Sequence, residues 1–245
     1  MQKELRTIDS SLGLCSLFMR YFSGFVLSIL VLGHVLVAAQ LCAAESASSN
    51  PVTNIVILRA GERLEAPHVV SYRLAEWEQM RGRWILPDVG YYDSGYGANQ
   101  LWLAGGGADI IQRKRFLWEQ EVYFAQAAGR EAHNERSLLI WQVFEFNFKH
   151  GIALQVVEYP TLPLDRAQRW GYDVDRVKLE RTIGERWKAG IGYAGSICAD
   201  RTWQNMPFGT VTRKTRAGSF EFWLERVPGG SQVQVRYQLV HSGRE

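Results

Sequence analysis

Hydrophobic and polar residues alternate with a period of two along most of the chain after residue 82. The clearest example is QVQVRYQLV at 232–240, where Val, Tyr and Leu alternate with Gln and Arg. Successive side chains of a β-strand point to opposite faces, so this pattern predicts strands with one apolar and one polar face. Because no long helical period accompanies it, the pattern predicts an all-β fold.

Ten such segments follow one another, separated by turn residues, at 83–92, 100–111, 115–126, 138–149, 152–159, 176–183, 187–198, 209–216, 219–226 and 232–240. Most are close to the ~9–11 residues that a membrane-spanning strand needs. Tight connections such as 112–114 alternate with longer polar ones such as 127–137. This alternation predicts an antiparallel up-and-down transmembrane β-barrel of about ten strands, with eight or twelve as alternatives.

The chain before residue 83 shows a weaker pattern. Residues 45–52 are polar, and 53–67 has the character of a short hairpin that turns at 60–62. Residues 68–82 are ambiguous, because Tyr72, Leu74, Trp77 and Met80 fit one helical face while 68–74 fits a strand equally well. We therefore expect 45–82 to be a polar leader with a small periplasmic segment, 83–240 to be the barrel and 241–245 to be a C-terminal tail.

An apolar run between Phe22 and Ala44 follows Arg20 and ends in small residues. This is the layout of a secretory signal, and cleavage after Ala44 removes residues 1–44. The run also reaches the ~20 apolar residues of a membrane-spanning helix, so an uncleaved anchor is the alternative. N-terminal sequencing of the exported protein checks the prediction: a chain that begins at Glu45 supports cleavage, and one that retains the run supports the anchor.

Small and aromatic residues indicate how the strands face. In 187–198, Gly190, Gly192 and Ala194 lie on the face opposite Trp187 and Ile191, and aromatic residues recur near the ends of several segments. Small residues fit a narrow barrel interior, and aromatic girdles are typical of membrane interfaces. With the export signal, these features make the chain resemble a small bacterial outer-membrane β-barrel of the porin-like class. It departs from such barrels at its end, which reads HSGRE rather than finishing on an aromatic residue.

The resemblance implies a non-enzymatic protein of the bacterial outer membrane, either a narrow channel for small solutes or a structural surface protein. Its expected partners are outer-membrane lipid or lipopolysaccharide and the barrel-insertion machinery. Period two does not say which face is inside, so a soluble periplasmic lipocalin-like carrier of an apolar ligand is one alternative. A barrel-borne lipid hydrolase is another, with the adjacent His241 and Ser242, or His133 in a long loop, as its candidate groups.

Charge and cysteine content exclude several other classes. The formal net charge is +3, from 28 Lys+Arg and 25 Asp+Glu, which argues against a nucleic-acid partner. Of the three cysteines, Cys15 and Cys42 fall in the predicted signal, which leaves Cys198 without an internal disulfide partner. No Cys/His motif suggests a metal site, and we expect no cofactor.

If the charged face lines the lumen, it collects five cationic and six acidic side chains. They are Arg115, Arg176, Lys178, Lys188 and Arg236 with Glu119, Glu121, Glu145, Glu180, Glu221 and Glu225. We expect them to pair across neighbouring strands and to fill much of the interior, because breaking up a buried pair costs several kcal/mol.

The loop at 160–175 is the second candidate site. Two prolines stiffen it, and it brings Arg166 and Arg169 close to Trp170 and Tyr172 in the sequence. Aromatic stacking and phosphate pairing would let these four side chains bind sugar or lipopolysaccharide head groups. A packed lid over the barrel is the alternative.

Overall fold

The computed structural model describes residues 52–65, 68–95, 99–129, 135–165, 171–197 and 203–242. These residues form twelve strands and one short 3-10 turn, Lys149–Gly151. The strands are β1 (Val52–Glu65), β2 (His68–Arg81), β3 (Trp84–Ser94), β4 (Asn99–Arg113), β5 (Phe116–Ala128), β6 (Arg136–Asn147), β7 (Ile152–Pro163), β8 (Gly171–Ile183), β9 (Trp187–Ile197), β10 (Trp203–Lys214), β11 (Gly218–Val227) and β12 (Gly230–Ser242). The predicted signal at 1–44 lies outside the described residues, which contain no helix long and apolar enough to cross a membrane.

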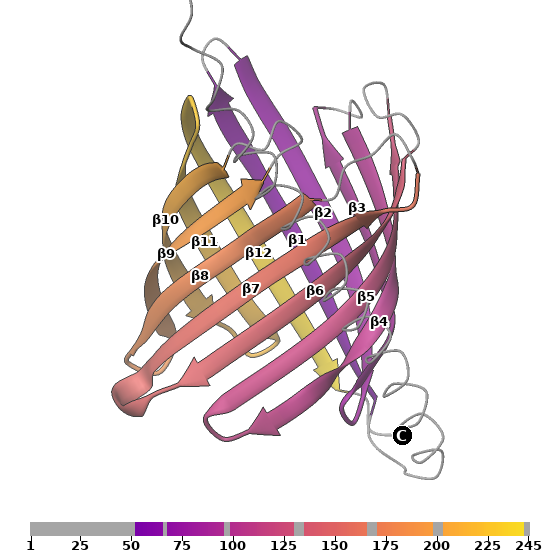
Figure 1. Cartoon of the computed structure of the whole chain (residues 1–245). Helices are drawn as coiled ribbons and strands as arrows, with labels where there is room; N and C mark the ends of the chain where they lie inside the picture. Colours follow the sequence, from indigo (N-terminus) through magenta and orange to yellow (C-terminus); the bar gives the residue numbers. More distant parts are fainter. Residues whose placement is uncertain are drawn as a thin grey trace, which may run out of the picture. The chain divides into compact units, whose positions relative to one another are not determined.

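Each strand pairs antiparallel with the next one in sequence, and β1 pairs with β12, so the sheet closes into a barrel (Figure 1). Thr53 lies opposite Ser242 in this closing pair, which places the start of β1 and the end of β12 on the same rim. The up-and-down β-barrel is therefore confirmed, but it has twelve strands rather than ten.

The two additional strands are β1 and β2, which occupy most of the segment expected to be a leader with a small periplasmic part. The hairpin does not turn at 60–62, since β1 runs through these residues to Glu65. Position 61, inside this strand, is occupied by glycine because a Cβ atom there would collide with the ring of Tyr72 on β2. The ten other strands match the ten predicted segments, with β12 extending to Ser242 at the start of the expected tail.

The barrel wall is apolar outside and polar inside. On β11, Phe220, Phe222 and Leu224 are 42%, 41% and 55% exposed, whereas Glu221 and Glu225 are each 5% exposed. A soluble carrier of an apolar ligand needs the opposite arrangement, with apolar side chains around the cavity. The burial pattern thus argues against the lipocalin-like alternative and matches a wall that faces lipid.

Glycine at 192 leaves space for an aromatic side chain inside the barrel. A Cβ atom there would collide with the ring of Phe208 on β10, whereas a Cβ atom at Gly209 would have its nearest neighbour 3.9 Å away. We expect Gly192→Ala to lower the free energy of unfolding by about 1–3 kcal/mol, because overpacking forces rings off their rotamers. Gly209→Ala should leave it nearly unchanged. Unfolding in denaturant, with the folded fraction read from heat-modifiable migration on a gel, compares the two variants. Equal changes in the free energy of unfolding would contradict the packing argument.

Candidate functional site

Ion pairs on the inner wall join β8 to β9 and to β11. The Lys178 ammonium lies 2.7 Å from Oε1 of Glu221 on β11 and 3.1 Å from Oε2 of Glu180 on its own strand. Lys188 on β9 donates to the same Glu180. Alternation places these side chains on one face, and their charges compensate one another as expected from the sequence.

One ion pair spans the lumen. Arg59 Nη1 on β1 lies 3.3 Å from Asp175 Oδ1 on β8, and the side chains are only 18% and 14% exposed. In the ring of strands, β9, β10, β11 and β12 separate these two strands on one side and β2 to β7 separate them on the other. The contact therefore crosses the interior and narrows it at this level. Arg176 Nη2 also lies 2.6 Å from Asp175 Oδ2, so two guanidinium groups share this carboxylate.

An aromatic cluster occupies the part of the lumen beside β9 to β11. The rings of Phe208 and Trp223 stack with centroids 4.2 Å apart, and both side chains are buried together with Ala194. The guanidinium of Arg176 lies 5.1 Å from the centre of the Trp223 ring, and that of Arg59 lies 6.0 Å from it. The cluster fills this side of the interior and fixes the arginines that hold the transluminal pair.

The opposite part of the lumen carries an acidic wall on β2 to β5. We use this name for six carboxylates: Glu76, Glu78, Asp88, Asp109, Glu119 and Glu121. Within the described part of the chain, no ion pair joins any of the six to a lysine or arginine side chain. Negative charge is therefore concentrated on this side, while the cationic side chains lie on β1, β8, β9 and β12.

A tyrosine hydroxyl lies at the centre of the acidic wall. The Tyr123 oxygen is 2.5 Å from Asp88 Oδ2, 2.9 Å from Glu121 Oε2 and 3.5 Å from Glu76 Oε1. A phenol has a single hydrogen to donate, so it satisfies only one of these three carboxylates at a time. Glu121, which we expected to pair with a cation, instead has acidic neighbours and this hydroxyl.

Most of the predicted lumen residues lie on the inner wall, and one does not. Glu119, Glu121, Glu145, Arg176, Lys178, Glu180, Lys188, Glu221, Glu225 and Arg236 lie on strands and are buried or half-buried. Arg115 is exposed in the turn between β4 and β5, because β5 begins one residue later than expected. Near the same rim, Glu145 accepts a hydrogen bond of 2.8 Å from the side chain of Asn147.

The predicted loop site is only partly described. Arg166, Arg169 and Trp170 lie outside the described residues. Tyr172 belongs to β8 rather than to a loop, and its hydroxyl donates to Glu158 on β7. The connection is shorter than expected because β7 continues to Pro163 and β8 starts at Gly171.

The candidate hydrolase residues do not form a catalytic arrangement where they are described. His241 and Ser242 are consecutive residues at the exposed end of β12, and the Ser242 hydroxyl lies 3.2 Å from that of Thr53. Adjacent residues of a strand point to opposite faces, so this histidine does not face this serine. His133 lies outside the described residues.

The structure also adds lumen residues that the sequence reasoning missed. Arg59, Glu76 and Glu78 lie on the two strands taken as a leader, and Asp88 and Asp175 were not assigned to either face. The alternation of Glu76 and Glu78 with Ala75 and Trp77 was the available signal. It indicates a strand with one charged face, which the helical interpretation of 68–82 obscured.

Solved outer-membrane channels share this fold. A KdgM porin is 9% identical, with a TM-score of 0.56 over 76% of this chain and 98% of the porin. A KdgM porin in complex with disordered oligogalacturonate is 8% identical, with a TM-score of 0.55 over 78% of this chain and 99% of the other. The COG4313 outer membrane channel from Pseudomonas putida F1 is 10% identical, with a TM-score of 0.56 over 80% of this chain and 97% of the channel.

The comparisons by sequence found no match, either to a protein-family model or to a curated protein. The likeness to the solved channels therefore concerns the fold, and it confirms the outer-membrane type of β-barrel. What passes through the lumen has to be argued from this chain's own residues.

Proposed function

We propose that the protein is a porin-like channel of the bacterial outer membrane with a narrow, partly obstructed lumen that passes small solutes. The observation that carries the proposal is the polarity of the barrel wall, which has exposed apolar side chains outside and buried charged side chains inside. A closed barrel with this polarity is stable when lipid covers it and water or ion pairs fill it. The fold shared with solved outer-membrane channels supports the same conclusion.

The lumen charges favour a small current with weak ion preference. Twelve strands lie between the eight that side chains fill and the sixteen or more that leave a wide aqueous channel. The pair between Arg59 and Asp175 obstructs the interior, and cations on one side face carboxylates on the other. Planar-bilayer recordings of the purified protein test this: small currents support the narrow channel, and large, strongly ion-selective currents contradict it.

The acidic wall should contribute to whatever ion preference exists. Glu121→Ala removes one of its carboxylates, so we expect the selectivity to shift toward anions. Val122→Ala is the matched control, since Val122 is the next residue along β5 and points to the other face. Reversal potentials in a salt gradient measure both variants. Equal reversal potentials in Glu121→Ala and the unaltered protein would contradict a role for this wall.

A structural surface protein is the second candidate, and the same transluminal pair favours it. If the pair closes the lumen completely, the unaltered barrel conducts nothing while still fractionating with outer membranes. Membrane fractionation with heat-modifiable migration identifies the barrel, and the bilayer recording then separates the channel from the structural protein.

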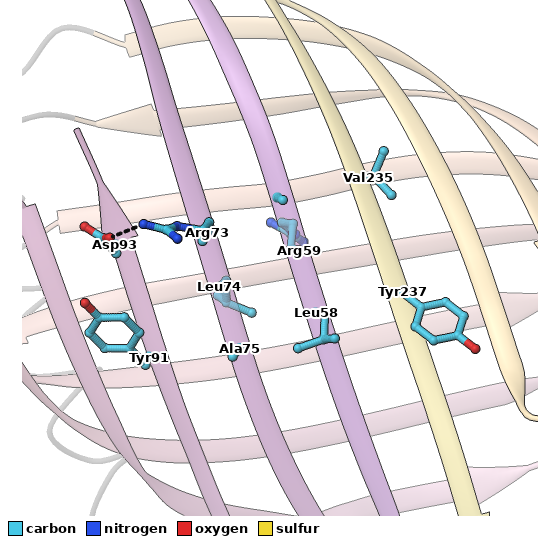
Figure 2. Close-up of a pocket in the computed structure, with 10 residues that line it drawn as sticks. Leu58, Arg59, Arg73, Leu74, Ala75, Tyr91, Asp93, Val235 and Tyr237 are labelled. Carbon is cyan, nitrogen blue, oxygen red and sulfur yellow. Dashed lines mark hydrogen bonds and ion pairs between the residues drawn. The ribbon is translucent and has the colours of Figure 1, made fainter. Parts of the chain in front are cut away.

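We propose outer-membrane lipid, including lipopolysaccharide, as the partner of the outer wall. Figure 2 shows a groove across β12, β1, β2 and β3 that is lined by Leu58, Tyr91 and Tyr237 and has Arg73 on β2. The groove holds about 550 Å³, and the Arg73 side chain is 68% exposed beside Asp93 at 3.2 Å. An arginine at the edge of an apolar groove suits an acyl chain with an anionic head group. Insertion of such a wall into the membrane would require the barrel-insertion machinery.

A further inference from the structure

Three carboxylates of the acidic wall converge on one point between β2 and β3. Glu76 and Glu78 are two residues apart on β2, so they share a face, and Asp88 on β3 lies directly opposite Glu78 in the strand register. One carboxylate oxygen from each of the three lies within 4.8 Å of the other two. Negative groups this close repel one another unless positive charge lies between them.

Asp88 supplies a separate observation that points to a ligand. The residue is 0% exposed, and its Oδ2 accepts the Tyr123 hydroxyl at 2.5 Å. Its other oxygen, Oδ1, is buried with no hydrogen-bond partner among the residues that the structure describes. Buried carboxylate oxygens are nearly always hydrogen-bonded or bound to a metal ion. Because Tyr123 holds Oδ2, this remaining oxygen is available to a cation.

We propose that Glu76, Glu78 and Asp88 form a calcium site in the inner wall of the barrel. Calcium binds oxygen ligands at 2.3–2.6 Å, so two ligands on opposite sides of the ion are about 4.6–5.2 Å apart. The three oxygens lie within 4.8 Å of one another, so a single calcium ion can contact all of them. Magnesium usually keeps several waters and binds through only one or two carboxylates, so three protein carboxylates favour calcium.

The surroundings allow entry and fix the geometry. Glu76 and Glu78 are half-buried, so the ion reaches them from the lumen and keeps water on its open side. Tyr123 is a positioning residue and not a ligand. Its hydroxyl donates to Asp88 and lies near Glu121, so it holds the Asp88 carboxylate in place. The site links two neighbouring strands and does not depend on whether the barrel conducts.

Isothermal titration of the purified, chelator-treated full chain in detergent with calcium chloride tests the site. We expect one calcium ion per chain and weaker binding of magnesium. Glu78→Gln should lower the calcium affinity more than about tenfold, since even residues behind the ligands typically change metal affinity by 10–100-fold. Tyr123→Phe should weaken binding less, because it removes support rather than a ligand.

Glu225→Gln is the matched control, since Glu225 is also a buried inner-wall carboxylate but lies on β11 and bonds Gln232. It should bind calcium as the unaltered protein does. Heat-modifiable migration shows that each variant is folded, and Glu76→Gln replaces Glu78→Gln if the latter fails this check. Absence of calcium binding, an unaltered calcium affinity in Glu78→Gln or its substitute Glu76→Gln, or magnesium binding as tight as calcium would each overturn the proposal.

Discussion

Asp175→Ala is expected to increase the current through a single barrel and to destabilise it. Asp175 accepts from Arg59 across the lumen and from Arg176 beside it, so its removal opens the obstruction and leaves two guanidinium groups without their shared carboxylate. Loss of one partner from a buried ion pair typically costs about 3–5 kcal/mol in the free energy of unfolding. The freed cations should also shift the selectivity toward anions. Single-channel recordings and denaturant unfolding measure the two effects.

The control for Asp175 is an aspartate that pairs with an arginine outside the lumen. Asp165 follows β7 and lies 2.8 Å from Arg136, and this pair is exposed at the rim. Exposed pairs contribute little to stability, so Asp165→Ala should change neither the current nor the unfolding by much. Asp175→Asn keeps the size of the side chain and removes its charge. If Asp175→Ala and Asp175→Asn both conduct like the unaltered protein, the pair does not limit passage.

Phe222→Arg is expected to impair assembly of the barrel strongly. Phe222 lies in the middle of β11 and is 41% exposed on the outer wall. An arginine on the lipid face of a barrel costs about 2–4 kcal/mol at the bilayer midplane, because its charge leaves water for hydrocarbon. Refolding into lipid vesicles, read as the folded fraction on a heat-modifiability gel, measures the loss.

Two controls separate the charge from its position. Phe222→Leu keeps the outer wall apolar and should assemble normally. Gln238→Arg places the same charge on the neighbouring strand at a half-buried position, beside Ser219 in the register and on the inner face. It should be tolerated better than Phe222→Arg. If the two arginine variants assemble equally well, the outer wall does not face lipid.

Most of the fold could be predicted because its strands obey one physical rule. From β3 to β12 each strand has one face toward lipid and one toward the interior, so apolar and polar residues alternate along its sequence. The first two strands obey the same rule, but Gly61 and Glu62 resemble a turn. Gly61 leaves space for the ring of Tyr72 on the neighbouring strand, and no local sequence pattern reveals this contact.

The lumen could be predicted less completely, for two physical reasons. A register shift between Val174 and Val177 breaks the alternation in β8, so both Asp175 and Arg176 contribute to the interior. A rule of strict alternation assigns them to opposite faces and misses the transluminal pair. The acidic wall is also hidden, because its six carboxylates come from four consecutive strands and only the registers of these strands bring them together.

The pairing of β1 with β12, which we call the seam, is the last step in the folding of the barrel. Thr53 and Ser242 pair there although almost the whole described chain separates them, so this contact has the greatest sequence separation in the sheet. Hairpins between consecutive strands can form early, but the seam waits for the last strand to arrive. Until then the first strand presents unpaired backbone groups, which are a template for pairing with other chains. A chain that lacks β12 therefore remains an open sheet with two free edges, and we expect such truncations to aggregate rather than to form a smaller barrel.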